Sequence, residues 1–447
     1  ELLWDFDHPA HSQLKLSQFY LIGGDYDTLS AEGKYLFAAQ KGRFHLNGSI
    51  QLENLAQVEL YDSLQGHISA DLQFSFTPNG WEAEGKGEIQ DFHYKGLTIK
   101  ETHAQINKDA LTFTHLSGSY DNLSFSSPYL HLSPLNALTD SSSSSFYIQG
   151  KLHLPNLNYA QIMTASDNSS TGSAPLNLIA EVELRIDTLF YSERQYGPLT
   201  AQVVYKPDTF AIPSLSMSQF AEGSIELSFM KTTHFIHLYS RFQNLNLHTL
   251  SQEVPELDTL FPLLPHLRGR ASGESELHLP LSQGLPRWMQ AEGNLKLLLR
   301  DFVVVESPYT YELFSLVPIT DFKRIQVGSV QAEVRLAEGV MRLDTTWLQA
   351  NQWRMRVAGS HTLRGELAYD LWVEVPRMLL EKSQQRVQEW VEEQNADLWK
   401  LAIKVSGTTS QPKFGWKAVA PRLSKPSGML PRRKSKKPKS SLPVEEN

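Results

Sequence analysis

Apolar and polar residues alternate with a period of two along several stretches of the chain. Every second residue is apolar from Ala70 to Phe76, and a similar pattern, with apolar or small residues, resumes from Trp81 to Ile89. Residues 77–80, which contain an Asn-Gly pair, separate the two stretches. Alternation predicts strands with one apolar face, and Asn-Gly is typical of a tight hairpin turn. The segment therefore predicts a long β-hairpin with one apolar and one solvated face.

Three later stretches repeat the pattern. They are Ile179–Asp187, Val327–Leu336 and Leu367–Val375. Each is longer than the typical strand of about five or six residues. Glycine residues such as Gly48 and Gly150 stand at the edges of many alternating stretches and indicate bends or bulges. The chain is predicted to be mainly β, with an extended sheet that has one apolar face.

Helical and loop patterns are few. Ser307–Val317 predicts a short helix, and Leu379–Asn395 is the best helix candidate because its apolar residues gather on one side. Asp140–Ser145 and Ser166–Pro175 are rich in small polar residues and indicate loops or linkers.

Composition and charge exclude several classes of protein. The chain has 447 residues, of which 41% are hydrophobic and 20% charged, as in folded proteins. It has no cysteine, which excludes disulfides, thiolate metal sites and cysteine nucleophiles. The net charge is −8 although residues 422–447 carry eight Lys or Arg and two acidic residues. The remainder is therefore acidic, which argues against a nucleic-acid surface over most of the chain.

No stretch reaches the roughly 18 apolar residues of a membrane-spanning helix. The strongest apolar run, Leu295–Val305, contains Lys296, Arg300 and Asp301. The chain begins at Glu1 rather than Met, so we expect a fragment or processed form, and a missing anchor here does not mean that the full protein lacks one.

Candidate catalytic and metal-binding groups are weak. His8 and His11 lie in a polar segment at the chain end, whereas zinc sites usually need three or four positioned ligands. His234 and His237 are three residues apart, which would place them on opposite faces of a strand. The sequence contains no nucleophile elbow, phosphate-binding glycine loop or dinucleotide fingerprint. We predict no enzyme, no cofactor and no metal.

Residues 418–447 are predicted to be a disordered basic tail. It is either a solubilising end or a segment attracted to anionic lipid head groups, each charge contributing about 1 kcal/mol near the surface. Loss of salt-dependent binding to anionic vesicles on deleting residues 422–447 would support the second reading. The candidate membrane-surface residues are Arg432, Arg433, Lys434, Lys436, Lys437 and Lys439.

A short motif, Asp followed by Ser or Thr and then an aliphatic residue or Thr, occurs at five places where composition predicts about one. It resembles the acceptor sequence of a periplasmic O-glycosylation system of some Gram-negative bacteria. Turns that begin with Asp-Thr explain it equally well, and an intact mass of native protein distinguishes the two. The candidate acceptors are Thr28, Ser63, Thr188, Thr259 and Thr345.

The chain from about Ser145 to Lys417 resembles the AsmA-like family of bacterial envelope proteins. Val405–Phe414 is similar to the family's closing Val-x-Gly-Thr-x-x-x-Pro signature, and Leu267–Leu279 followed by Gln290–Leu297 is similar to its glycine-containing strands. Two features depart from the family. Arg300–Phe302 lacks the usual glycine, and the expected N-terminal membrane helix is not in this chain.

The resemblance implies a long curled antiparallel β-sheet that forms an elongated apolar groove, with a few short helices near the C-terminus. The AsmA-like region is placed at 146–417. Residues 1–140 have the same style of long strands and are predicted to form an N-terminal β-groove segment, and the tail follows at 418–447. The resemblance also implies a periplasmic protein anchored in the inner membrane, with a role in phospholipid transport or outer-membrane homeostasis. Its partners would be phospholipid, membrane and other envelope proteins. A β-rich envelope scaffold or outer-membrane assembly factor without lipid cargo is the alternative.

A lipid carrier must cover acyl chains, because each CH₂ exposed to water costs about 0.8 kcal/mol. Alternating strands along a curved sheet supply such a surface, although an ordinary sandwich core uses the same alternation. The candidate lining residues are Leu72, Phe74, Phe76, Val182, Leu184, Ile186, Val330, Val334, Leu336, Leu371 and Val373.

Overall fold

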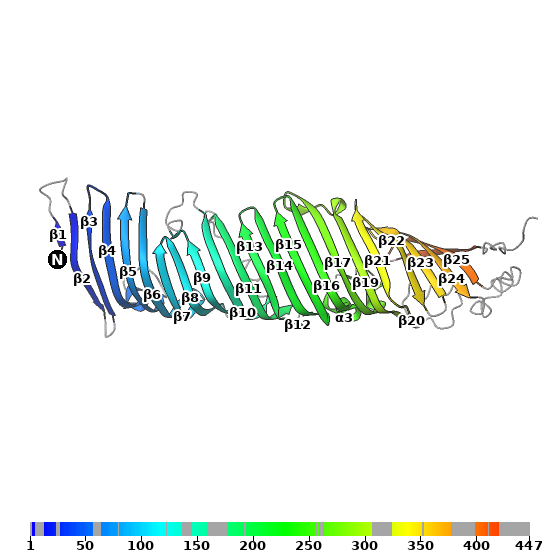
Figure 1. Cartoon of the computed structure of the whole chain (residues 1–447), viewed down its shortest axis with the longest axis horizontal. Coiled ribbons are helices and arrows are strands. Elements are labelled where there is room, and N and C mark those ends of the chain that lie inside the picture. The colour runs from blue at the N-terminus through cyan, green and yellow to red at the C-terminus, as the bar shows by residue number, and fades with distance from the viewer. Residues whose placement is uncertain are drawn as a thin grey trace, which may run out of the picture.

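The computed structural model is one long, open and curled β-sheet (Figure 1). It describes residues 2–4, 13–23, 27–56, 64–78, 80–121, 123–135, 145–159, 177–191, 194–255, 257–258, 261, 263–305, 324–350, 353–376, 398–409 and 411–419. In these residues 25 strands form a continuous, mostly antiparallel sheet, and the two-residue strand β18 pairs with β17 alone. The predicted mainly β fold with a curled sheet is confirmed.

The strands of the first half run from the left of Figure 1 to its centre. They are β1 (Leu2–Trp4), β2 (Gln13–Gly23), β3 (Asp27–Leu36), β4 (Lys41–Gln51), β5 (Gln65–Thr77), β6 (Gly80–Tyr94), β7 (Leu97–Lys108), β8 (Ala110–Tyr120), β9 (Leu123–Ser133), β10 (Phe146–Asn158), β11 (Leu178–Tyr191), β12 (Arg194–Tyr196) and β13 (Leu199–Lys206).

The second half continues the same sheet. Its strands are β14 (Thr209–Phe220), β15 (Gly223–Thr232), β16 (Phe235–Asn246), β17 (Leu267–Ser282), β18 (Leu285–Pro286), β19 (Glu292–Val305), β20 (Arg324–Gln326), β21 (Val330–Ala337), β22 (Val340–Ala350), β23 (Trp353–Thr362), β24 (Leu367–Pro376), β25 (Leu398–Gly407) and β26 (Pro412–Val419).

The predicted strands are found with two corrections. The 70–89 hairpin is β5–β6, closed by pairing of Thr77 with Gly80. Val327 was expected to begin a strand, but β21 starts at Val330, because Val327 instead forms an isolated bridge with Ala350. The tail was expected from residue 418, but β26 continues to Val419 because it pairs with β25.

Two short α-helices are described, α1 (Leu52–Ala56) and α3 (Leu247–Glu253), with 3₁₀ turns η3 (Leu264–His266) and η4 (Trp288–Gln290). Helix α3 is fastened to the sheet by Glu253, whose carboxylate accepts a hydrogen bond from the Ala221 backbone N–H at 2.8 Å. The predicted helices Ser307–Val317 and Leu379–Asn395, the loop Ser166–Pro175 and nearly all of Asp140–Ser145 lie outside the described residues.

The two long edges of the sheet differ (Figure 1). The hairpin edge, uppermost in the figure, carries the connections β3–β4, β5–β6, β7–β8, β13–β14, β15–β16, β17–β19 and β21–β22. The helix edge, lowermost, carries α1 and α3. A core cluster lies near the helix edge, where Leu247 of α3 packs with Ala271, Leu299 and Val330 of the sheet.

One strand pair departs from the antiparallel pattern. β10 and β11 run parallel, with Phe146 opposite Leu178 and Asn158 opposite Phe190. β10 also pairs with β9. The sheet is therefore continuous between the predicted region 1–140, which contains β9, and the predicted region 146–417, which contains β10.

Glycine is required in β6 where a positive φ coincides with a close approach to the neighbouring strand. Gly85 of β6 has φ +149°, and a Cβ there would meet the carbonyl oxygen of Asp71 on β5. We expect Gly85→Ala to destabilise the β5–β6 pair by about 1–3 kcal/mol, the cost of a strained backbone conformation. Amide hydrogen exchange of these two strands measures it.

Gly415 of β26 is the matched control, because an added Cβ finds nothing within 4 Å. Gly415→Ala should change local stability by no more than about 0.5 kcal/mol. Unaltered exchange in β5 and β6 of Gly85→Ala would contradict the steric argument.

Candidate functional site

A continuous row of uncharged side chains crosses the second half of the sheet. Residues that pair directly across strands share a face, so register defines which side chains lie together. The members of this long row are Leu152, Leu184, Ala201, Leu215, Leu227, Ser240, Ser275, Leu295, Val334, Leu343, Gly359, Tyr369, Val405 and Phe414.

A second row covers the same face in the first half. Its members are Ala31, Leu46, Leu72, Gly85, Ile106, Leu111, Leu132, Ile148 and Ala180. Ala180 and Leu184 are four residues apart on β11, so both rows lie on one face. We call the two rows together the apolar strip. It joins the predicted residues Leu72, Leu184 and Val334, which are far apart in sequence.

The opposite face carries charges in register. Glu226, Arg241, Glu274, Lys296 and Glu333 follow one another across β15, β16, β17, β19 and β21, with alternating sign. The ammonium of Lys296 lies 3.0 Å from a carboxylate oxygen of Glu274, and this hydrogen bond lowers the pKa of Glu274. Such exposed pairs contribute little stability individually, but they show which face meets water.

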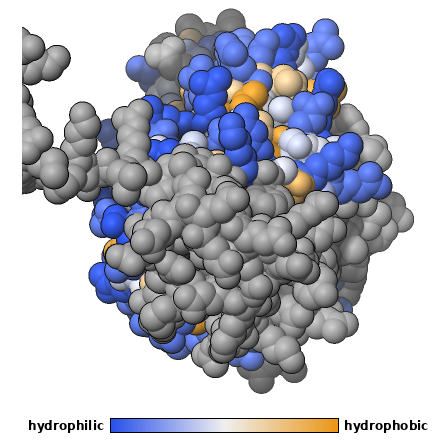
Figure 2. Space-filling view, turned by 90° about the vertical axis from the view of Figure 1, so that its right-hand side faces the viewer, coloured by the Kyte–Doolittle hydropathy of each residue, from blue (hydrophilic) through white to orange (hydrophobic). Residues whose placement is uncertain are grey.

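The predicted lining residues divide into buried and partly accessible ones. Ile186, Val330, Leu371 and Val373 are buried near the helix edge, and Ile186 is only 3% exposed. There they form part of the packed core, as the sandwich-core alternative expects. The others are partly accessible: Leu72, Phe74, Phe76, Val182, Leu184, Val334 and Leu336. Figure 2 shows hydrophobic residues between hydrophilic ones in the upper part of the end view.

The sequence reading missed several members of the strip. Leu215 was not selected because β14 has an irregular register between Ile212 and Leu215, which interrupts the period of two. Leu227 was missed although Ile225, Leu227 and Phe229 alternate regularly on β15. Leu295 was hidden in an apolar run, where both faces look alike. The glycine residues at the edges of the alternating stretches were the sequence signal that bulges occur in these strands.

Two polar pairs lie on the face that carries the apolar strip. The hydroxyl oxygens of Ser240 and Ser275 lie 2.6 Å apart. Nδ1 of His361 lies 2.8 Å from the Tyr369 hydroxyl oxygen. Burial lowers the pKa of His361 and raises the pKa of Tyr369 to about 12, so both are neutral near pH 7. These pairs keep polar atoms on the strip satisfied without adding charge.

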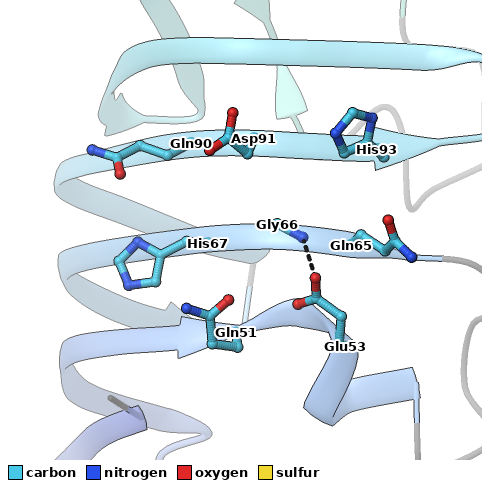
Figure 3. A pocket seen from close by; sticks show the side chains of 8 residues that line it. All are labelled: Gln51, Glu53, Gln65, Gly66, His67, Gln90, Asp91 and His93. Atoms are coloured by element: carbon cyan, nitrogen blue, oxygen red, sulfur yellow. Dashed lines mark hydrogen bonds between the residues drawn. The ribbon is translucent and has the colours of Figure 1, made fainter. Parts of the chain in front are cut away.

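A polar hollow of about 590 Å³ lies at the helix-edge ends of β4, β5 and β6 (Figure 3). Its side chains include Gln51, His67, Gln90 and Asp91, and Glu53 of α1 accepts a hydrogen bond from the Gly66 N–H at 3.3 Å. Glu53 therefore serves to hold α1 against β5. In the described part of the chain, no group of three or more His, Asp or Glu side chains is placed to hold a metal ion.

The remaining predicted site residues are scattered. Thr28 and Thr345 are exposed on β3 and β22, whereas Thr188 is half-buried on β11. His234 lies in the β15–β16 connection, and Nε2 of His237 lies 2.9 Å from a carboxylate oxygen of Glu276. Ser63, Thr259, His8, His11 and the tail residues Arg432, Arg433, Lys434, Lys436, Lys437 and Lys439 fall outside the described residues.

Comparisons with protein-family models, curated proteins and solved structures find no match to this chain. The AsmA-like resemblance therefore stays a prediction. No helix among the described residues has the length and apolarity needed to cross a bilayer.

The His361–Tyr369 pair generates a pH prediction. Because the folded chain lowers the pKa of His361, the unfolded chain takes up this proton first as pH falls. The contribution of neutral His361 to the free energy of unfolding should be complete above about pH 6.5, the usual histidine pKa. It should shrink as the pH falls below that value. Denaturant unfolding of the wild type and His361→Gln at pH 7.5 and pH 5 measures the difference.

The titration of His45 does not disturb this comparison. A hydrogen bond with Asp71 raises its pKa, so its effect has the opposite sign, but it is present in both proteins and cancels in the comparison. The prediction would be contradicted if the wild type exceeded His361→Gln in free energy of unfolding by more at pH 5 than at pH 7.5.

Proposed function

We propose that this chain is a non-enzymatic lipid-transfer protein whose apolar strip carries phospholipid acyl chains. The observation that supports this most is the long row, which contains no charged residue from β10 to β26. Leu184, Leu227, Leu295 and Val334 of this row remain partly accessible. An acyl chain lying on them would exchange water for apolar contacts, while its head group stays solvated.

The energetics favour a continuous strip over isolated patches. Exposing an acyl chain of about 16 carbons to water costs on the order of 12 kcal/mol at about 0.8 kcal/mol per CH₂. A gap in the strip would impose part of that cost at each crossing. With strands about 4.8 Å apart, the two rows together give a path on the order of 100 Å from β3 to β26, longer than a bilayer of about 40 Å.

The cellular setting of this proposal comes from the family resemblance. It is a periplasmic protein, anchored to the inner membrane by an upstream helix, that contributes to outer-membrane homeostasis. Phospholipid, the membrane and other envelope proteins are its proposed partners.

One observation favours the scaffold alternative. Ile186, Val330, Leu371 and Val373 are buried in closed packing near the helix edge. If the whole apolar face were closed in this way, the sheet would serve as a rigid envelope scaffold without lipid cargo.

Substitutions at accessible positions on the face that carries the apolar strip test the proposal. Phe74→Asp combined with Val334→Asp should reduce phospholipid that co-purifies without detergent by about ten-fold, because a buried carboxylate near an acyl chain is strongly disfavoured. Lipid extraction and mass spectrometry measure the loss, and circular dichroism measures folding.

Gln73→Asp with Gln331→Asp is the matched control. Both residues are exposed on the opposite face of the same strands as Phe74 and Val334. The control should retain the wild-type amount of lipid. Wild-type protein free of phospholipid would favour the scaffold, and gross unfolding of Phe74→Asp with Val334→Asp would indicate a closed core.

A further inference from the structure

The last strand of the sheet presents an open edge. β26 pairs with β25 over eight residue pairs, from Lys400 with Val419 to Gly407 with Pro412. No other strand in the part of the chain that the structure describes pairs with β26. Along the unpaired side of an edge strand, backbone N–H and C=O groups stand free to pair with another strand. Such a row of donors and acceptors therefore lies beside β25 at the right-hand end of the sheet (Figure 1).

This edge is regular along its length. The pairing of β26 with β25 has no register shift, and the one proline of β26, Pro412, stands at its first position. Natural edge strands are often kept from pairing by bulges, by prolines, by very short length or by lysines. β26 is eight residues long and has no bulge, so its lysines are the main feature that restricts which strand can pair with it.

The charged residues of β25 and β26 are all basic. They are Lys400, Lys404, Lys413 and Lys417. Both lysines of β26 are exposed. Lys413 lies opposite Ser406, and Lys417 lies opposite Ala402. Neither lysine of β26 therefore meets a carboxylate across the strand pair.

The acidic residues of the last three strands belong to β24, on the far side of β25 from the open edge. Glu374 lies between Arg354 and Lys400, and one of its carboxylate oxygens is 2.9 Å from the Lys400 ammonium. Asp370 lies opposite Lys404. These acidic residues already face lysines of β25. A further strand beside β26 could supply the carboxylates that its two lysines lack, and opposite charges on neighbouring strands stabilise the pairing.

The other face of β26 belongs to the apolar strip. Phe414 is the last member of the long row and is partly accessible. It stands between Lys413 and Gly415, so lysines and apolar residues of β26 point to opposite faces. A strand added at this edge would meet lysines on one face and apolar side chains on the other. It must therefore alternate acidic and apolar residues.

We propose that the open edge of β26 receives an extended strand from a partner protein in which acidic and apolar residues alternate. Main-chain hydrogen bonds supply the affinity of strand addition, and the side chains on the two faces select the partner. Edge-to-edge pairing of two copies through β26 would bring lysines against lysines, which disfavours a second copy as the occupant. The inference does not depend on lipid transfer by the strip.

A synthetic peptide that alternates glutamate with valine tests the proposal. The chain has no cysteine, so Gln411→Cys permits a single fluorescent label beside β26. We expect the acidic peptide to change the fluorescence of this label saturably. The same peptide with lysine in place of glutamate should bind at least about ten-fold more weakly, because like charges then face each other. An acidic peptide N-methylated at alternate amides cannot donate the edge hydrogen bonds and should not bind.

Charge reversal at the edge gives the second readout. Lys413→Glu with Lys417→Glu should reverse the preference, so that the lysine peptide binds at least about ten-fold more tightly than the acidic peptide. Both side chains are exposed, so the circular dichroism spectrum should not change. Lys34→Glu with Lys86→Glu is the matched control, because both lysines are exposed on strands far from β26. The control should keep the wild-type preference.

Three results would overturn the proposal. They are failure of the wild type to bind the acidic peptide, equal binding of the N-methylated peptide, and an unchanged preference in Lys413→Glu with Lys417→Glu. The first result would mean that the lysines keep the edge closed to all strands. The other two would mean that the peptide binds without pairing to β26.

Discussion

Strand register is the constraint on which the rest of this structure depends. Side chains alternate between faces, so a slip of one residue would turn an entire strand over. In the observed register Leu184, Leu295 and Val334 share one row, and Glu274 meets Lys296 on the other face. A slip would expose the leucines and place ion pairs on the apolar face. Hydrophobic contact and solvation of charge therefore select the same pairing across the sheet.

Irregularities preserve this separation where strands must bend. In β14, Ile212 and Leu215 are three residues apart, yet they pair with Phe229 and Leu227 on one face of β15. The extra residue on β14 shifts the alternation of its side chains by one position. The apolar side chains on both sides of the bulge therefore stay on the same face and do not turn to the charged face. The bend is accommodated by the backbone, and the apolar strip continues unbroken across it.

The same physics explains what the sequence could predict. Regular alternation identified β5, β6, β11 and β24 and the face on which their apolar residues lie. It could not give the depth of burial, because Val182 and Ile186 alternate identically on β11, yet of the two only Ile186 belongs to the core cluster with Leu154 of β10 and Met217 of β14. It could not reveal the parallel β10–β11 pairing either, since the period of two does not encode strand direction. Both depend on contacts between remote segments.

Depth is also what separates a binding surface from a core. Near the helix edge, α3 and the cluster around Leu299 and Val330 close the sheet over its apolar face. This half supplies the apolar burial that keeps long strands folded. Near the hairpin edge the connections are tight turns that cover little, so Leu227 and Leu295 stay partly accessible. A chain selected only for a packed core would gain by covering them. Their accessibility along many consecutive strands is therefore the feature that a folding role alone does not explain.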